Sequence, residues 1–158
     1  MVDQHVSFSI GDPGLETRID ALLAQMTLDE KVGQMNQLDP RRGGDLEQEI
    51  RAGCVGSLLS ITDVREINRF QRIAVEESRL GIPLIVGNDV IHGYRTTFPI
   101  PLAGSCTWNP AAIERAARIA ATEAAACGTD WIFSPMVDVC RDPRWGRIAE
   151  GAGEDPFL

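Results

Sequence analysis

The feature that most constrains the fold is an alternation of short apolar runs with longer amphipathic stretches. The apolar runs span residues 54–61, 83–87 and 131–137, and each has the length of a strand that is buried on both faces. The stretches between them, which begin at Asp63 and at Asn109, carry apolar residues at helical spacing. Strands that alternate with helices in this way pair in parallel through right-handed crossovers. The sequence therefore predicts an α/β fold with a parallel sheet.

Two more helices are predicted ahead of the first strand. The apolar stripe of the first of these helices consists of Ile19, Leu22, Leu23 and Met26. Thr27 and Glu30 have the spacing of a capping box, in which each side chain binds the backbone amide of the other residue, so a second helix is expected to begin there. The apolar side chains of this second helix are Leu28, Val32 and Met35. We expect them to face the core.

Three parallel strands do not complete a sheet. The outer strands would expose unpaired backbone groups, and the faces would lack helices to cover them. We therefore expect the chain to be part of a barrel or of a doubly wound sheet. The open edge would be covered by the remainder of that fold or by another copy of the chain.

Composition and charge argue against several classes of partner. The formal net charge of −8 opposes attraction to nucleic acid and to anionic membrane surfaces, so we expect neither as a partner. No stretch approaches the roughly 20 apolar residues of a membrane span, and the first residues lack the basic start and apolar run of a signal peptide. The compartment stays open between the cytoplasm and, after processing, the periplasm or the exterior.

The cysteines do not indicate a metal site. The four cysteines stand far apart, without a paired histidine at ligand spacing, so we expect no zinc and no cofactor. The simplest interpretation is that each is a small buried thiol that packs as an apolar residue.

Functional groups are concentrated after the second and third predicted strands, where a parallel barrel places its ligands. Asp89 follows the second strand, and Arg147 lies in the segment that follows the third. A carboxylate and a guanidinium can together bind the vicinal hydroxyls of a neutral sugar, each bidentately. Structural roles are the alternative, with Asp89 capping a loop amide and Arg147 pairing with a nearby acid.

Other polar residues of these segments are interpreted as supports. His92 could act as a general base, but its position between Ile91 and Gly93 favours a packed histidine bonded to the backbone. Arg144 could form a structural stack with Trp145 or a platform for a sugar. The acids expected to hold loops in place are Asp138, Glu150, Glu154 and Asp155.

Four segments of the chain resemble glycoside hydrolase family 3, in the family's order. They lie at residues 26–35, 82–93, 135–138 and 142–156, and the last, which begins Asp-Pro-Arg-Trp-Gly-Arg, is the most specific. The resemblance runs from about Leu15 to Leu158 and is strongest to the bacterial β-glucosidase branch, of periplasmic type. It implies a (β/α)8 TIM-type barrel, followed by a second α/β domain.

The chain would then cover roughly the first three β/α units of that barrel, in residues 15–158, with residues 1–14 as an N-terminal extension. The resemblance also implies exo-acting, retaining hydrolysis of terminal β-linked glucose or xylose. Asp89 and Arg147 would hold hydroxyls of the terminal sugar, and His92 and Arg144 would support their loops.

The family's nucleophile and acid/base lie in motifs that have no counterpart in these 158 residues. The chain is therefore expected to supply sugar ligands but no catalytic residue, and to be inactive alone, with the rest of the barrel and the second domain as partners. The alternative is a catalytically silent carbohydrate-binding or interaction module.

Overall fold

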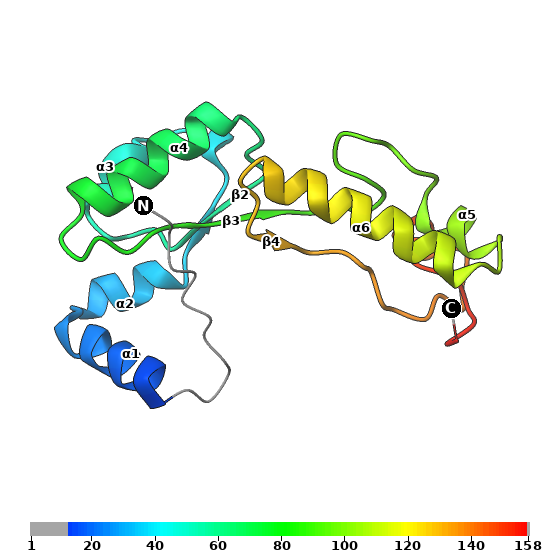
Figure 1. Ribbon diagram of the computed structural model, residues 1–158, viewed down its shortest axis with the longest axis horizontal. Helices are drawn as coiled ribbons and strands as arrows, with labels where there is room; N and C mark the ends of the chain where they lie inside the picture. Colours follow the sequence, from blue (N-terminus) through cyan, green and yellow to red (C-terminus); the bar gives the residue numbers. More distant parts are fainter. Residues whose placement is uncertain (1–12, 158) are drawn as a thin grey trace, which may run out of the picture.

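The computed structural model of the protein describes residues 13–157, so all but the last two residues of the predicted extension over 1–14 lie outside the described part. Its sheet has four parallel strands in the order β1-β2-β3-β4 (Figure 1). The strands are β1 (Gln37–Leu38), β2 (Ser57–Leu59), β3 (Ile85–Asn88) and β4 (Trp131–Ile132). Each strand pairs with the next one along the chain, which confirms the predicted parallel α/β fold.

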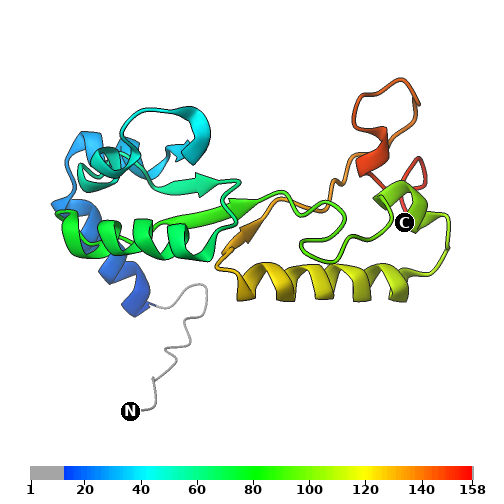
Figure 2. The same ribbon diagram turned by 90° about the horizontal axis from the view of Figure 1, so that it is seen from above.

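Six α-helices and three shorter helical segments accompany the sheet in residues 13–157. The α-helices are α1 (Pro13–Gln25), α2 (Leu28–Gln34), α3 (Leu46–Arg51), α4 (Val64–Arg72), α5 (Pro101–Ser105) and α6 (Pro110–Ala126). The shorter segments are η1 (Pro40–Arg42), the π-helix η2 (Ile73–Glu77) that continues α4, and η3 (Ile148–Glu150). The crossover helices α4 and α6 lie on the same side of the strands, as right-handed crossovers require (Figure 2).

The predicted helix starts are confirmed by their caps. Thr27 and Glu30 form the complete capping box of α2. The carboxylate of Asp63 accepts a hydrogen bond from the backbone N of Arg65 at the start of α4. The side chain of Asn109 accepts one from the backbone N of Ala112 at the start of α6. Local sequence therefore determines where these helices begin.

The hydrophobic core lies between the central strands and the helices α3 and α4. Its fully buried members include Leu58 of β2 and Val86 of β3, both 0% exposed. The apolar residues at helical spacing in α4 and η2 face this core, because Ile67, Phe70 and Ala74 are all buried in it. Burial of apolar surface on this scale is the main source of stability for a sheet that has helices packed against it.

The predicted orientation of α2 is wrong. Leu28, Val32 and Met35 are 75%, 53% and 80% exposed. The helix instead turns Gly33 toward the loop before β2, and a Cβ at Gly33 would lie 2.1 Å from the carbonyl oxygen of Gly53. Close backbone approach therefore decides which face of α2 is buried, and the apolar residues stay on its outer side.

The apolar face of α6 is buried only in its C-terminal half. Ala120 and Ala124 are buried, whereas Ile113 and Ala117 are exposed. In Figure 1 the N-terminal part of α6 extends past the strands, beside α5. The helix ends at Ala126, and Gly128 two residues later has a φ of +86°, which suits glycine.

The cysteines follow the prediction in part. All four are free thiols, and Cys127 and Cys140 are buried. Cys106 is exposed and Cys54 is only half-buried, so the expectation that every cysteine is a buried thiol is wrong. Cys106 follows α5, which lies on the outer part of the molecule beyond the strands (Figure 1). Within residues 13–157, no helix is long and apolar enough to cross a membrane.

An ion pair between the buried Glu30 and the exposed Arg79 connects α2 to the segment after η2. The carboxylate of Glu30 accepts hydrogen bonds from the guanidinium of Arg79, with Nε at 2.9 Å, and from the backbone N of Thr27 at 2.8 Å. The Arg79 bonds, followed by those from Thr27, lower the pKa of Glu30 from 4.5 to about 2. This carboxylate is therefore ionised in the folded protein even in moderately acid solution.

Glu30 is expected to make folding sensitive to acid. Because its pKa is lower in the folded state, its stabilisation is fully present above pH 4.5 and is lost as the pH falls toward about 2. Urea unfolding of the Glu30→Gln variant should therefore show a smaller loss of stability between these pH values than the unaltered protein. Glu66→Gln, at an exposed site on α4, is the matched control and should keep the original pH slope. Equal slopes for all three proteins would contradict the prediction.

Candidate functional site

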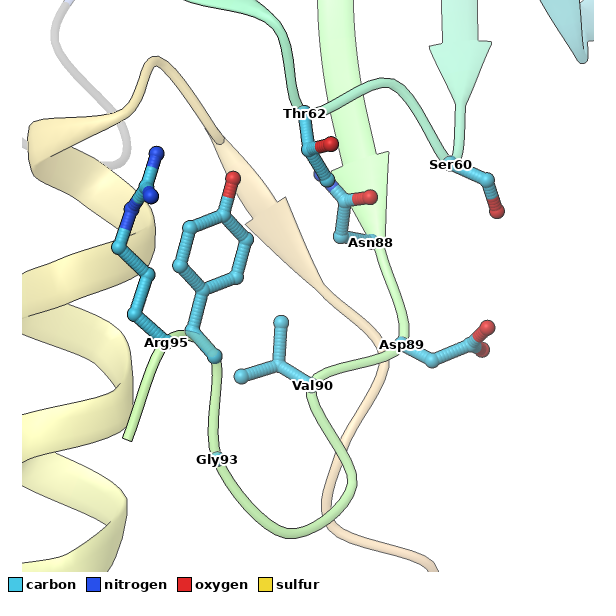
Figure 3. Close-up of a pocket in the computed structure, with 8 residues that line it drawn as sticks. Ser60, Thr62, Asn88, Asp89, Val90, Gly93 and Arg95 are labelled. Carbon is cyan, nitrogen blue, oxygen red and sulfur yellow. The ribbon is translucent and has the colours of Figure 1, made fainter. Parts of the chain in front are cut away.

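A polar cavity of about 420 Å³ lies at the carboxyl ends of β2 and β3 (Figure 3). Its lining consists of Ser60, Thr62, Asn88, Asp89, Val90, Gly93, Tyr94 and Arg95. Most of these side chains carry hydrogen-bonding groups, and Asp89 is the acid among them. Ligands of parallel α/β folds bind at this edge, so the cavity has both the position and the chemistry of a binding site.

Asn88 connects neighbouring strands at the base of the cavity. Its buried side-chain amide donates hydrogen bonds to the backbone O of Ile61, at 3.2 Å, and to Oγ1 of Thr129, at 3.0 Å. These partners follow β2 and precede β4, so one side chain connects the ends of three neighbouring strands.

Replacing Asn88 with alanine should destabilise the protein by about 1–3 kcal/mol, because two buried polar groups lose their partner. Urea unfolding would measure this loss. Asn68→Ala, at an exposed position of α4, is the control and should change the stability by less than about 0.5 kcal/mol. An Asn88 variant as stable as this control would show that water replaces the lost bonds without cost.

The loop after β3 folds back on itself around Gly93. The backbone N of Phe98 donates to the O of His92 at 2.8 Å, and Nδ1 of His92 lies 3.0 Å from the O of Phe98. Gly93 has a φ of +119°, and a Cβ there would lie 2.0 Å from the O of Thr96. Glycine is therefore required at this turn.

Asp89 begins this loop and its carboxylate is available to a ligand. In Figure 3 its side chain points away from the loop, on the same side as Ser60. The backbone O of Asp89 accepts a hydrogen bond from Ser134, which connects the loop to the segment after β4. No hydrogen bond from within residues 13–157 reaches the carboxylate itself, so the structural alternative, that it caps a loop amide, is not what the structure shows.

Arg147 lies in the segment after β4 and is half exposed. Its Nη2 is 2.6 Å from the carboxylate of Glu150, and Nε donates to the same oxygen. This bond, more than the charges of Asp138 and Asp89, raises the pKa of Arg147. Arg147 is thus paired with a nearby acid, which was the alternative to sugar binding. It is not among the residues that line the cavity, although the negative charge of Asp89 contributes to raising its pKa.

The two predicted supports both bind within their own segments. His92 bonds to the backbone, as expected, although it is exposed and not packed. Arg144 pairs with Asp142 through Nη2 at 2.6 Å, and its side chain is 89% exposed. Glu150 binds Arg147, and the carboxylate of Asp155 accepts from the backbone N of Phe157 at 2.8 Å, which agrees with loop-holding roles for these acids.

Sequence reasoning missed Tyr94 and Arg95 as cavity residues and Asn88 as the link between strands. The position of Asn88, directly before Asp89 at a strand end, is the signal that could have identified it. Burial raises the pKa of the Tyr94 hydroxyl, so this group stays protonated at neutral pH. Within the described residues, no three His, Cys, Asp or Glu side chains gather as a metal ion would need.

The chain is similar to known glycosidases over most of its length. The profile of the glycosyl hydrolase family 3 N-terminal domain matches residues 27–158. The periplasmic β-glucosidase of Salmonella typhimurium is 41% identical over 142 residues, which cover 87% of this chain and 18% of that protein. A β-xylosidase of Formosa agariphila is 29% identical over 160 residues, which cover 95% of this chain and 17% of that protein.

Solved structures show the same fold. The β-glucosidase of Listeria innocua in complex with glucose superimposes with a TM-score of 0.80 at 41% identity, covering 90% of this chain and 22% of that one. The chain thus spans about a fifth of the length of the relatives it matches. The profile match and the shared parallel sheet confirm the family resemblance of the four sequence segments. The chain therefore belongs to glycosyl hydrolase family 3, and its sheet and helices form part of the family's N-terminal barrel domain.

Proposed function

We propose that this chain supplies the sugar-binding part of the site of an exo-acting, retaining β-glucosidase or β-xylosidase. The observation that carries the proposal is the carboxylate of Asp89, which lines the polar cavity at the strand ends and accepts no hydrogen bond from residues 13–157. A carboxylate with free acceptor positions binds adjacent sugar hydroxyls well, because each hydroxyl donates a charge-assisted bond. The similarity to β-glucosidases and to a β-xylosidase supports this choice of ligand.

Arg147 is proposed as the second sugar ligand. A guanidinium has five N–H donors, and Glu150 accepts one hydrogen bond from Nε and one from Nη2. The remaining donors are available to a hydroxyl or ring substituent of the same sugar. In this proposal Glu150 orients the guanidinium and does not compete for it, while His92 and Arg144 hold the loops on either side.

The catalytic pair is proposed to lie outside this chain. Retaining hydrolysis needs two carboxyl groups about 5 Å apart, one to attack the anomeric carbon and one to protonate the leaving group. Among the residues that line the cavity, Asp89 is the one carboxylate, and here it is assigned to sugar binding. The chain alone is thus proposed to bind sugar without hydrolysing it.

The open edge of the sheet at β4 supports the proposal that other residues continue the barrel. Within residues 13–157, β4 pairs with β3 alone, and the nearby side chains of Trp131, Val137 and Val139 are 51%, 82% and 45% exposed. A parallel edge strand flanked by exposed apolar side chains is stabilised when another strand pairs with it. We propose that the rest of a barrel covers this edge, with residues 15–158 as its first units.

A chimera tests the proposal directly. Residues 27–158 would replace the corresponding segment of the Listeria innocua β-glucosidase, and hydrolysis of an aryl β-glucoside would be measured beside that of the isolated chain. The expected result is turnover by the chimera and none by the isolated chain. A folded chimera that binds glucose without turnover would favour the non-catalytic carbohydrate-binding module instead. Enzyme-like turnover by the isolated chain would contradict the assignment of the catalytic pair to other residues.

A further inference from the structure

Glu123 of α6 does not line the cavity, but it binds the loop after β3, which carries several of the residues that do. Its Oε2 accepts hydrogen bonds from the backbone N of Arg95, at 2.9 Å, and of Thr96, at 2.8 Å. Its Oε1 accepts a third bond from Oγ1 of Thr96, at 2.6 Å. One carboxylate therefore fixes two successive amides and a side chain of the loop after β3.

Glu123 belongs to the part of α6 that carries the buried residues of the helix. Glu123 lies between Ala120 and Ala124, the two α6 residues that are buried. Both buried residues lie in the C-terminal half of α6, whereas Ile113 in the N-terminal half is exposed. The bonds from Thr96, with smaller contributions from Arg95, hold the pKa of Glu123 below its usual range, so the group is ionised at neutral pH.

The turn around Gly93 needs an attachment of its own, because its internal bonds only close it on itself and the bond from Ser134 reaches the loop at its first residue, Asp89. The bonds between His92 and Phe98 join the two ends of the turn around Gly93 and do not connect it to a helix. Glu123 makes that connection, next to Tyr94 and Arg95, which line the cavity. The loop is therefore held at Asp89 by β3 and at Thr96 by α6.

We propose that Glu123 is a positioning residue, which holds the loop after β3 on α6 and so orients the cavity wall at Tyr94 and Arg95 for a sugar. It acts through the loop and does not touch the sugar. The choice of a sugar as the ligand rests on the proposed function. The attachment of the loop by Glu123 can be measured without any ligand.

The test uses the full chain and three variants on α6. Glu123→Ala removes all three acceptor bonds. Glu123→Gln keeps an oxygen for the two backbone amides and gains an NH₂ that can donate to the Thr96 hydroxyl, so it should rescue the attachment. Glu114→Ala is the control, because Glu114 is an exposed acid of the same helix and, in the described part of the chain, pairs only with Arg118 one turn away.

Amide hydrogen exchange by NMR and titration with glucose are the two measurements. In Glu123→Ala, exchange at Arg95 and Thr96 should accelerate, and the glucose Kd should rise, each by about tenfold or more. The Gln variant should stay within about threefold of the unaltered chain in both. The amide of Val86, a core residue of β3 that donates to the carboxylate of Asp130, should be unchanged in every variant and reports that the fold is intact.

Thr96→Val is a milder variant in case Glu123→Ala does not fold. It removes one of the three bonds and should accelerate exchange at Thr96 by about threefold. Unchanged exchange at Arg95 and Thr96 in Glu123→Ala, or a Gln variant as defective as the Ala variant, would overturn the inference. An unaltered chain that binds no glucose while its loop amides respond as expected would contradict the proposed function and still support the attachment by Glu123.

Discussion

Replacing Asp89 with alanine should lower kcat/KM of the chimeric β-glucosidase on an aryl β-glucoside by about 100-fold or more, with little effect on stability. The expected loss follows from two charge-assisted hydrogen bonds to sugar hydroxyls, each worth about 1.5 kcal/mol or more. Stability should hold because the carboxylate accepts no hydrogen bond from residues 13–157. Steady-state kinetics and thermal unfolding of the same preparation measure both effects.

Two further variants make this result specific. Asp89→Asn keeps a hydrogen-bonding side chain without its charge, so its kcat/KM should lie between those of the unaltered chimera and Asp89→Ala. Asp29→Ala removes an exposed acid from the first turn of α2 and should leave kcat/KM unchanged. An Asp89→Ala chimera with unaltered kinetics would remove the basis for a sugar ligand in this cavity.

The parallel fold was predictable because its signals are local. Caps such as Asn109 and the buried runs around Leu58 and Val86 report the start of a helix or the inside of a sheet from a few neighbouring residues. The strand β1 was missed because two residues, Gln37 and Leu38, are too short to show a period. The family resemblance then distinguished a barrel from a doubly wound sheet, which the pattern alone left open.

The orientation of α2 was not predictable from its apolar residues. The period of the helix was correct, but Gly33 and the ion pair of Glu30 determine its inner face, and both depend on partners about 20 and about 50 residues away along the chain. Contacts of this kind have no local signature, so a pattern of apolar side chains will favour the wrong face.

The candidate site was predictable to a similar degree. Asp89 could be placed because it directly follows a buried strand, and its availability to a ligand agrees with that placement. The pairing of Arg147 with Glu150, three residues away, was open as an alternative because both residues are close in sequence. Glu123 was not found, since it binds a loop about 27 residues distant and its own helix shows only an alanine-rich face.

Replacing Gly93 with alanine should disable the same loop by a different route. A Cβ at this position would lie 2.0 Å from the O of Thr96, and the φ of +119° is strained for any residue with a side chain. The backbone must therefore move, and the bonds between His92 and Phe98 should break with it. We expect a loss of about 1–3 kcal/mol in stability together with a fall in kcat/KM of about 100-fold or more.

The combination of effects distinguishes Gly93→Ala from Asp89→Ala. The Gly93 variant should accelerate amide exchange at Arg95, Thr96 and Phe98 as well as lowering activity, because the loop itself is displaced, whereas Asp89→Ala should leave these amides protected. Gly104→Ala is the matched control, since the nearest atom to its added Cβ would be Ile113 Cγ1 at 4.0 Å, and it should change neither quantity. If Gly93→Ala kept full activity, the cavity wall would not depend on the turn at Gly93, and a sugar would have to be held by Asp89 and Arg147 without the shape that this loop provides.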